Sequence, residues 1–127
     1  MPVEGALRDP FVIRREVEFT REQIAAYADA SGDHNPIHID DDFARTVGLP
    51  GIIAHGMLQM GLMATVAAEA AGGPEKLRRL YCRFAGMVVP GDVVTFAAEP
   101  LPAGKLDLRA INQRSEAVLT KSFAEHD

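Results

Sequence analysis

The order of apolar and polar residues predicts a strand, a short helix and then further helices. Residues 11–19 (FVIRREVEF) are β-prone at both ends and partly alternate between apolar and charged side chains, so they predict a first strand. Thr20 and Gln23 follow at the spacing of a capping box, in which each side chain bonds the backbone of the other residue. The helix that begins there is expected to bury one stripe, formed by Ile24, Tyr27 and Ala28. It is expected to end at Gly32.

A second short helix, a long apolar helix and four strands complete the pattern. An Asp of residues 40–42 (DDD) can cap a short helix around Phe43 that ends near Gly48. The long helix is expected from about Ala54 to the breaker at residues 72–74 (GGP). Four β-like segments follow, separated by turn residues: 76–89, 92–100, 105–113 and 117–127.

The long helix is apolar all round, and a curled antiparallel sheet of four or five strands can cover such a helix. The predicted fold class is therefore α+β: one hot-dog domain over residues 1–127, with the sheet wrapped around a central apolar helix. A membrane-spanning helix over residues 53–71 is the alternative, because this segment would reach about 27 Å as a helix. Its His55, Gln59 and Glu69, and its many Ala and Gly residues, favour a helix buried in its own domain.

Composition and charge exclude several classes of partner. The net charge of −5 and the aromatic content of 6% argue against nucleic acid, which needs a basic surface and stacking side chains. The single cysteine, Cys82, excludes an internal disulfide and a metal site built from cysteines. Residues 1–10 lack the basic and then apolar run of a signal peptide, so we expect a cytoplasmic protein with no membrane partner.

Titratable residues concentrate in residues 31–44 (SGDHNPIHIDDDFA), just before the most apolar part of the chain. Asp33 and His38 lie in the loop between two short helices. There a carboxylate and an imidazole can share one water and perform general acid–base catalysis near neutral pH. The alternative is ordinary loop chemistry, in which Asp33 and Asn35 bond nearby backbone N–H groups and His38 faces solvent. Spacing alone favours this alternative.

Other residues give weaker signals. A metal site on His34 and His38 is disfavoured, because Pro36 interrupts the helix that would bring them to one face. The N–H of Gly56, at the start of the long helix, could stabilise an oxyanion; alternatively, Gly56 serves close packing and His55 caps the helix. A basic cluster could bind the phosphates of an acyl carrier or form an ordinary solvated face: Lys76, Arg78, Arg79 and Arg83.

Three segments together resemble the MaoC-like family of R-specific enoyl-thioester hydratases. Residues 27–44 (YADASGDHNPIHIDDDFA) resemble its signature, which is an aromatic residue, small residues and then G-D-x-N-P-[aliphatic]-H. Residues 48–61 (GLPGIIAHGMLQMG) are similar to the segment that leads into the family's central helix. Residues 83–94 (RFAGMVVPGDVV) are similar to the strand and turn that follow. Ser115 departs from the pattern, since relatives often place a turn glycine there.

The resemblance implies an active site and a reaction. It implies that Asp33 and His38 are the catalytic pair and that the amide of Gly56 forms the oxyanion hole. Asn35 and Pro36 are then loop-shaping residues. The implied reaction is the reversible addition of water to a trans-2-enoyl thioester, which gives an (R)-3-hydroxyacyl thioester in fatty-acid or related acyl metabolism. Neither a cofactor nor a metal ion is expected.

The expected partner is an acyl thioester on coenzyme A or acyl carrier protein, of open chain length. We expect a homodimer or a higher even oligomer, because one curled sheet leaves an exposed edge and an uncovered face; a companion hot-dog subunit is the alternative. Two other functions stay open: a non-catalytic acyl-binding subunit of a heteromeric dehydratase, and a hot-dog thioesterase. The pair of Asp33 and His38 argues against the first, and a long helix whose only acid is Glu69 argues against the second.

Overall fold

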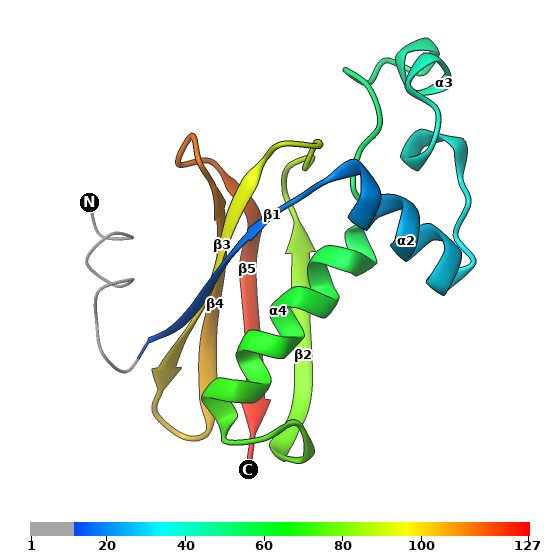
Figure 1. Ribbon diagram of the computed structural model, residues 1–127. Coiled ribbons are helices and arrows are strands. Elements are labelled where there is room, and N and C mark those ends of the chain that lie inside the picture. The colour runs from blue at the N-terminus through cyan, green and yellow to red at the C-terminus, as the bar shows by residue number, and fades with distance from the viewer. Residues whose placement is uncertain (1–11) are drawn as a thin grey trace.

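The structure is a computed structural model that describes residues 12–127 as one antiparallel sheet with a long helix lying across it (Figure 1). The elements, in chain order, are β1 (Ile13–Glu18), α2 (Arg21–Ser31), the 3-10 helix η1 (Pro36–His38), α3 (Asp41–Thr46), α4 (Gly56–Ala71), the 3-10 helix η2 (Pro74–Lys76), β2 (Leu77–Phe84), β3 (Val93–Leu101), β4 (Lys105–Asn112) and β5 (Ala117–His126). The five strands lie in the order β1-β3-β4-β5-β2, and each neighbouring pair is antiparallel. The predicted α+β fold, a curled sheet around a central helix, is confirmed.

Local sequence signals set the ends of the short helices. The Oγ1 of Thr20 accepts the N–H of Gln23 at 3.1 Å, and the Oδ1 of Asp40 accepts the N–H of Phe43 at the start of α3. Gly32 ends α2 with a φ of 79°, a left-handed conformation that favours glycine. The capping box expected at α2 forms only in part. The Oε1 of Gln23 is buried without a partner, so it does not return to the backbone of Thr20.

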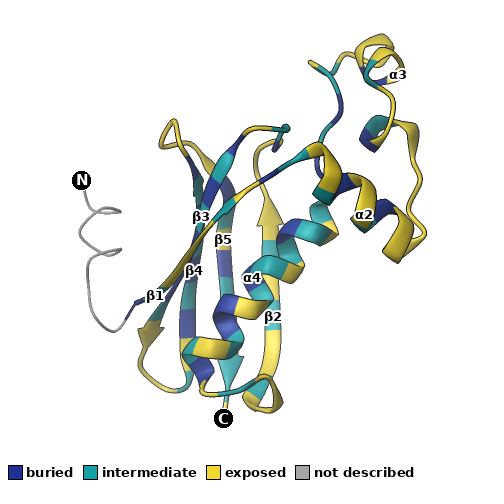
Figure 2. Cartoon of the chain, viewed as in Figure 1, coloured by how far each residue is buried: buried dark blue, intermediate teal, exposed yellow. Residues whose placement is uncertain are grey.

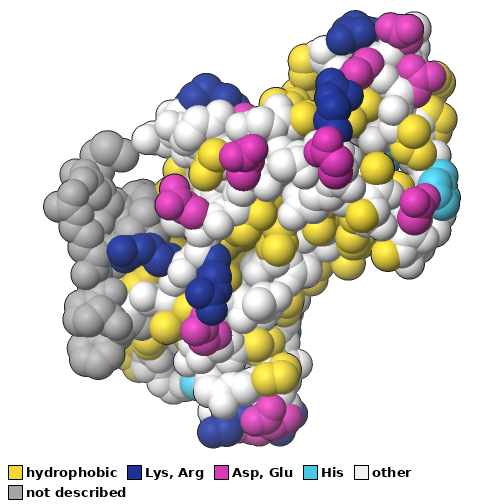
Figure 3. All heavy atoms as spheres, in the orientation of Figure 1, with side chains coloured by type: hydrophobic (Ala, Val, Ile, Leu, Met, Phe, Trp, Pro, Cys, Tyr) yellow, Lys and Arg dark blue, Asp and Glu magenta, His cyan; other side chains and the backbone are white. Residues whose placement is uncertain are grey.

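The core lies between α4 and the inner face of the sheet. α4 begins at Gly56, slightly later than the expected start near Ala54, and buries one face: Gln59, Met63, Val66, Ala67 and Ala71. The opposite face is open in a single chain, since Met57 is 60% exposed and Gly61 and Thr65 are exposed as well (Figure 2). Figure 3 shows hydrophobic side chains running in a band over this open side towards the end that carries α2. No helix among residues 12–127 has the length and hydropathy needed to cross a membrane.

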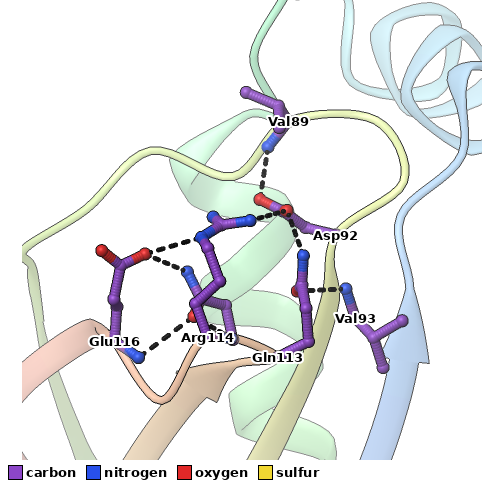
Figure 4. Close-up of polar contacts among 7 residues, drawn as sticks. Val89, Asp92, Val93, Gln113, Arg114 and Glu116 are labelled. Carbon is purple, nitrogen blue, oxygen red and sulfur yellow. Dashed lines mark hydrogen bonds and ion pairs between the residues drawn. The ribbon is translucent and has the colours of Figure 1, made fainter.

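A buried carboxylate joins the β2–β3 loop to the β4–β5 hairpin (Figure 4). Asp92 accepts the N–H of Val89 at 3.0 Å, the Nε2 of Gln113 at 2.9 Å and the Nη1 of Arg114 at 3.2 Å. Burial opposes its ionisation, but these donors outweigh burial, and the pKa of Asp92 is lowered. The Asp92 carboxylate therefore fixes the turn at one end of the sheet.

Replacing Ser115 by Gly is expected to stabilise this hairpin. Ser115 has a φ of 62°, in the left-handed region that is unfavourable for a residue with a Cβ. Glycine relieves this strain, but it also gives the unfolded chain more conformational entropy, which offsets part of the gain. The net effect should be to raise the free energy of unfolding by about 0.5–1 kcal/mol. Urea denaturation of the wild type and of Ser115→Gly measures this difference. A lower stability of the variant would contradict the claim that the backbone of Ser115 is strained.

Candidate active site

The loop between α2 and α3 is shaped by its own polar side chains. The Oγ of Ser31 accepts the N–H of Asp33 at 3.1 Å, and the Oδ1 of Asp33 accepts the N–H of Asn35 at 3.2 Å. The Oδ1 of Asn35 accepts the N–H of Ile37 at 3.2 Å, and Pro36 occupies the first turn of η1. The predicted Asx-turns are therefore present. They use only one oxygen of Asp33 and leave its Oδ2 available.

The side chain of His38 is buried and points its two nitrogens at different partners. Its Nδ1 lies 2.7 Å from the backbone oxygen of Ile53, and its Nε2 lies 4.0 Å from the Oδ2 of Asp33. The Asp33 side chain is 53% exposed, so the space between the two groups can be reached by water. A water bonded to both would bridge this gap, since each hydrogen bond spans about 2.8 Å. The solvent-facing His38 of the loop-chemistry alternative is wrong, because its ring is held inside.

The segment before α4 holds His38 in place. Ile53 donates its N–H to the backbone oxygen of Ile37 at 3.1 Å, so this segment pairs with η1. Next to it, the N–H of Ile52 donates to the Oδ1 of Asp41 at 2.9 Å, and Arg21 bonds the other oxygen of that carboxylate. The Ile52 N–H, and then Arg21, lower the pKa of Asp41. Helices α2 and α3 are thus tied to the segment that orients His38.

His55 is the residue whose place in the site the sequence did not reveal. Its Nε2 lies 3.0 Å from the backbone oxygen of Asp33, and its ring stacks on His38 with centroids 3.8 Å apart. Tyr27 contacts the same ring edge-on at 4.8 Å. The alternative in which His55 caps the helix is right for its position, since His55 is the N-cap residue of α4, but its side chain makes no capping hydrogen bond. The only hint in the sequence is a polar ring inside the apolar run of residues 52–58.

Gly56 is the first residue of α4, directly after His55. Helix geometry leaves the N–H groups of the first turn without intrahelical acceptors, and the helix dipole makes this end positive. A Cβ on Gly56 would lie 3.3 Å from the ring of Phe84, so the glycine lets this ring pack close to the start of α4, as the close-packing alternative expected. The N–H groups at this end can therefore stabilise negative charge beside Asp33 and His38.

The structure brings three of these side chains together as a candidate metal site. Asp33, His38 and His55 each offer one donor atom, and these atoms lie within 4.8 Å of one another. The two imidazole rings are stacked with centroids 3.8 Å apart and planes only 23° apart, so their lone pairs lie in two nearly parallel planes, one above the other. Chelation needs directions that converge on one ion, and therefore this arrangement fits shared hydrogen bonding better than coordination.

Residues elsewhere in the chain have other partners. His34 bonds Asp29 at 3.0 Å and stands apart from the pair. Cys82 is a half-buried free thiol, and burial raises its pKa, as expected of a packed side chain rather than a nucleophile. Two members of the basic cluster are engaged by acids at the end of β5: Arg78 by Asp127 and Arg79 by Glu125.

Known proteins share this sequence pattern and this fold. Fatty acid synthase subunit beta of Aspergillus oryzae is 42% identical over 73 residues, which are 56% of this chain and 4% of that protein. The peroxisomal enoyl-CoA hydratase 2 of Arabidopsis thaliana is 35% identical over 66 residues, 50% of this chain and 21% of that protein. The chain thus spans a small part of the length of both relatives.

A solved structure matches almost end to end. The (R)-hydratase from A. caviae involved in PHA biosynthesis aligns with a TM-score of 0.78 and 28% identity, over 89% of this chain and 90% of that one. The family model described as a MaoC-like domain matches residues 3–121. Fold, motif and family model agree over nearly the whole sequence, and the chain belongs to the MaoC-like domain family.

Proposed function

We propose that the chain is a hydro-lyase that adds water reversibly to trans-2-enoyl thioesters and yields (R)-3-hydroxyacyl thioesters. The observation that carries this proposal is the 4.0 Å spacing between the Oδ2 of Asp33 and the Nε2 of His38, beside the N-terminus of α4. The names of the relatives, an (R)-hydratase and an enoyl-CoA hydratase 2, support the same reaction. Asp33 and His38 are the proposed catalytic residues, with Asn35 and Pro36 shaping their loop.

In the proposed mechanism, the pair positions one water and moves two protons. The water held between Asp33 and His38 forms a C–O bond to the β carbon of the enoyl group, and one of its protons passes to the pair. The electron pair of the C=C bond moves towards the thioester carbonyl, whose oxygen takes up enolate charge. A proton then passes from the pair to the α carbon, so that water has been added across the double bond.

The enolate oxygen is the group that the start of α4 would stabilise. The Gly56 N–H is free of an intrahelical acceptor, and the glycine places no side chain of its own beside this amide. A fixed donor aimed at such an oxygen lowers the barrier by about 3 kcal/mol in other enzymes. Since the charge develops only during the reaction, this contact should act mainly on turnover.

The two alternative functions fit the contacts less well. A thioesterase would need an acid near the start of α4, but Glu69 lies about 20 Å along the helix and is bonded to Arg15 at 2.9 Å. A non-catalytic acyl-binding subunit has no need for an imidazole whose Nδ1 is held by Ile53 while its Nε2 faces a carboxylate. Both observations favour the hydro-lyase.

Assays with enoyl thioesters of increasing length, on coenzyme A and on acyl carrier protein, test this function. We expect the wild type to hydrate at least one of them, seen as loss of the conjugated enoyl-thioester absorbance. Binding of the thioesters without turnover would favour the acyl-binding alternative, and release of free thiol would favour the thioesterase.

We also propose a homodimer in which a second copy covers β2 and the open face of α4. β2 is an edge strand, and its Tyr81 and Phe84 are 43% and 47% exposed. Light scattering should give about twice the 13.7 kDa of the chain. Tyr81→Lys should shift the protein towards monomer, whereas Phe43→Lys, at an exposed aromatic on α3, should not. A fully active wild-type monomer would contradict the proposal, and a stable complex with a different hot-dog chain would replace it.

The cellular location of the protein is also a proposal. We propose that the protein acts in the cytoplasm, and a sequence whose single cysteine allows no internal disulfide is typical of proteins in such a reducing compartment. Fractionation of cells that express the full chain would test this location.

A further inference from the structure

His55 lies at the centre of the site, yet it belongs neither to the acid–base pair nor to the oxyanion donor. Its side chain is 1% exposed. Its Nε2 lies 3.0 Å from the backbone oxygen of Asp33, and its ring plane lies 23° from that of His38, with centroids 3.8 Å apart. One side chain therefore contacts both members of the pair.

The acceptors determine which nitrogen of each neutral ring carries the hydrogen. The backbone oxygen of Ile53 can only accept, so the Nδ1 of His38 donates to it and the Nε2 keeps its lone pair towards Asp33. The backbone oxygen of Asp33 also can only accept, so the Nε2 of His55 donates to it. The Nδ1 of His55 is then a buried lone pair without a partner.

A buried nitrogen without a partner lowers stability, so packing alone does not explain a histidine here. A phenylalanine would fill similar space and keep both ring contacts, the stack on His38 and the edge contact with Tyr27. It would lack only the Nε2–H that holds the Asp33 carbonyl. This N–H is the feature that distinguishes histidine at this position.

We propose that His55 is a positioning residue, whose Nε2–H fixes the backbone of Asp33 while its ring fixes the plane of His38. The Oδ2 of Asp33 and the Nε2 of His38 then stay at the spacing that one water can bridge. Residues 53–56 thereby serve the whole site: a carbonyl orients His38, His55 orients both catalytic residues, and an amide faces the oxyanion. The inference rests on the proposed hydratase function of the pair.

Two variants of His55 separate its hydrogen bond from its ring contacts. His55→Phe keeps the stack and loses the donor, whereas His55→Gln keeps a donor near the position of Nε2 and loses the stack. We expect His55→Phe to lower kcat by about 10²-fold, the effect of a small misplacement of reacting groups, while KM changes less than about threefold. His55→Gln should retain at least about ten times the kcat of His55→Phe, since a donor remains.

Thermal melting and a double-mutant cycle distinguish positioning from a structural role. The melting midpoint of His55→Phe should stay close to that of the wild type, because removal of the buried lone pair offsets the lost bond to the Asp33 carbonyl. In an Asp33→Asn background, His55→Phe should cost less than about threefold, since the carboxylate it positions is already absent. A wild-type kcat in His55→Phe, a loss that follows a lower midpoint, or an equal loss in both backgrounds would each overturn the proposal.

Imidazole ¹⁵N spectra of the wild type test the inference without the reaction. We expect His55 as the Nε2–H tautomer and His38 as the Nδ1–H tautomer. If His55 carries its hydrogen on Nδ1, the bond to the Asp33 carbonyl does not exist and the positioning role fails, whatever the activity. If both tautomers are as expected but no enoyl thioester is hydrated, the proposed function fails, and the positioning role of His55 in hydration fails with it.

Discussion

Asp33→Asn is expected to lower the rate of enoyl-thioester hydration by about 10²–10⁴-fold, the usual contribution of a general acid–base group. Asn keeps the oxygen that accepts the N–H of Asn35, so the loop should hold its shape, but it cannot take up a proton at Oδ2. The Asp33 side chain is largely exposed, and thus the melting midpoint should stay close to that of the wild type. Loss of enoyl-thioester absorbance gives the rate, and thermal melts give the stability.

His38→Ala should cause a similar loss of rate together with a measurable loss of stability. It removes a buried ring and the bond to the backbone oxygen of Ile53, which should destabilise the chain by about 1–3 kcal/mol. Because the two residues act as one unit, the double variant Asp33→Asn/His38→Ala should be little slower than either single variant.

His34→Ala is the matched control for both variants. His34 lies in the same loop, but its Nε2 bonds the exposed Asp29 rather than the pair. This variant should retain activity. An Asp33→Asn variant that hydrates at the wild-type rate, or an equal loss in His34→Ala, would remove the basis for the catalytic pair.

The second large effect is expected for Gly56→Val, which should lower turnover about 10²–10³-fold, as removal of one oxyanion donor does elsewhere. The branched side chain would occupy the approach of the thioester carbonyl to the amide. KM should change far less, because the contact strengthens only as charge develops on the oxygen. Steady-state kinetics on the best substrate, with melts of both proteins, measure the two effects.

Phe84 supplies the control for this variant. A Cβ at Gly56 would lie 3.3–3.4 Å from the Phe84 ring, so displacement of that ring is the competing cause of any loss. In the double variant Gly56→Val/Phe84→Leu, the smaller Leu gives the valine side chain room, but the valine still blocks the approach to the amide N–H. Recovery of turnover in the double variant would show that ring displacement, and not a blocked amide, caused the loss.

Local chemistry made the boundaries of the elements predictable. The Oδ1 of Asp40 needs only the N–H of Phe43, three residues on, and Gly32 needs only its own left-handed backbone. The G-D-x-N-P-x-H motif is also local, because its turns join residues two apart: Ser31 with Asp33, Asp33 with Asn35, and Asn35 with Ile37. Contacts between residues two or three positions apart can be predicted from the sequence alone.

The contacts that assemble the site are not encoded in this way. Asp33 and His55 are far apart in sequence, and so are His38 and Ile53, so only the docking of residues 49–55 against η1 brings them together. The same limit explains why the Gln23 half of the capping box was wrong. Its Oε1 is covered by the surrounding structure and makes no hydrogen bond, an outcome that depends on tertiary contacts rather than on the spacing to Thr20.

Product stereochemistry in the wild type and in Asp33→Asn tests the central claim most directly. Each protein is incubated with the enoyl thioester that the wild type hydrates best, and the 3-hydroxyacyl product is resolved by chiral chromatography. The proposed (R)-specific hydration by Asp33 and His38 predicts the (R) product alone from the wild type and almost none from Asp33→Asn. An (S) or racemic product from the wild type, or as much (R) product from a folded Asp33→Asn, would contradict it.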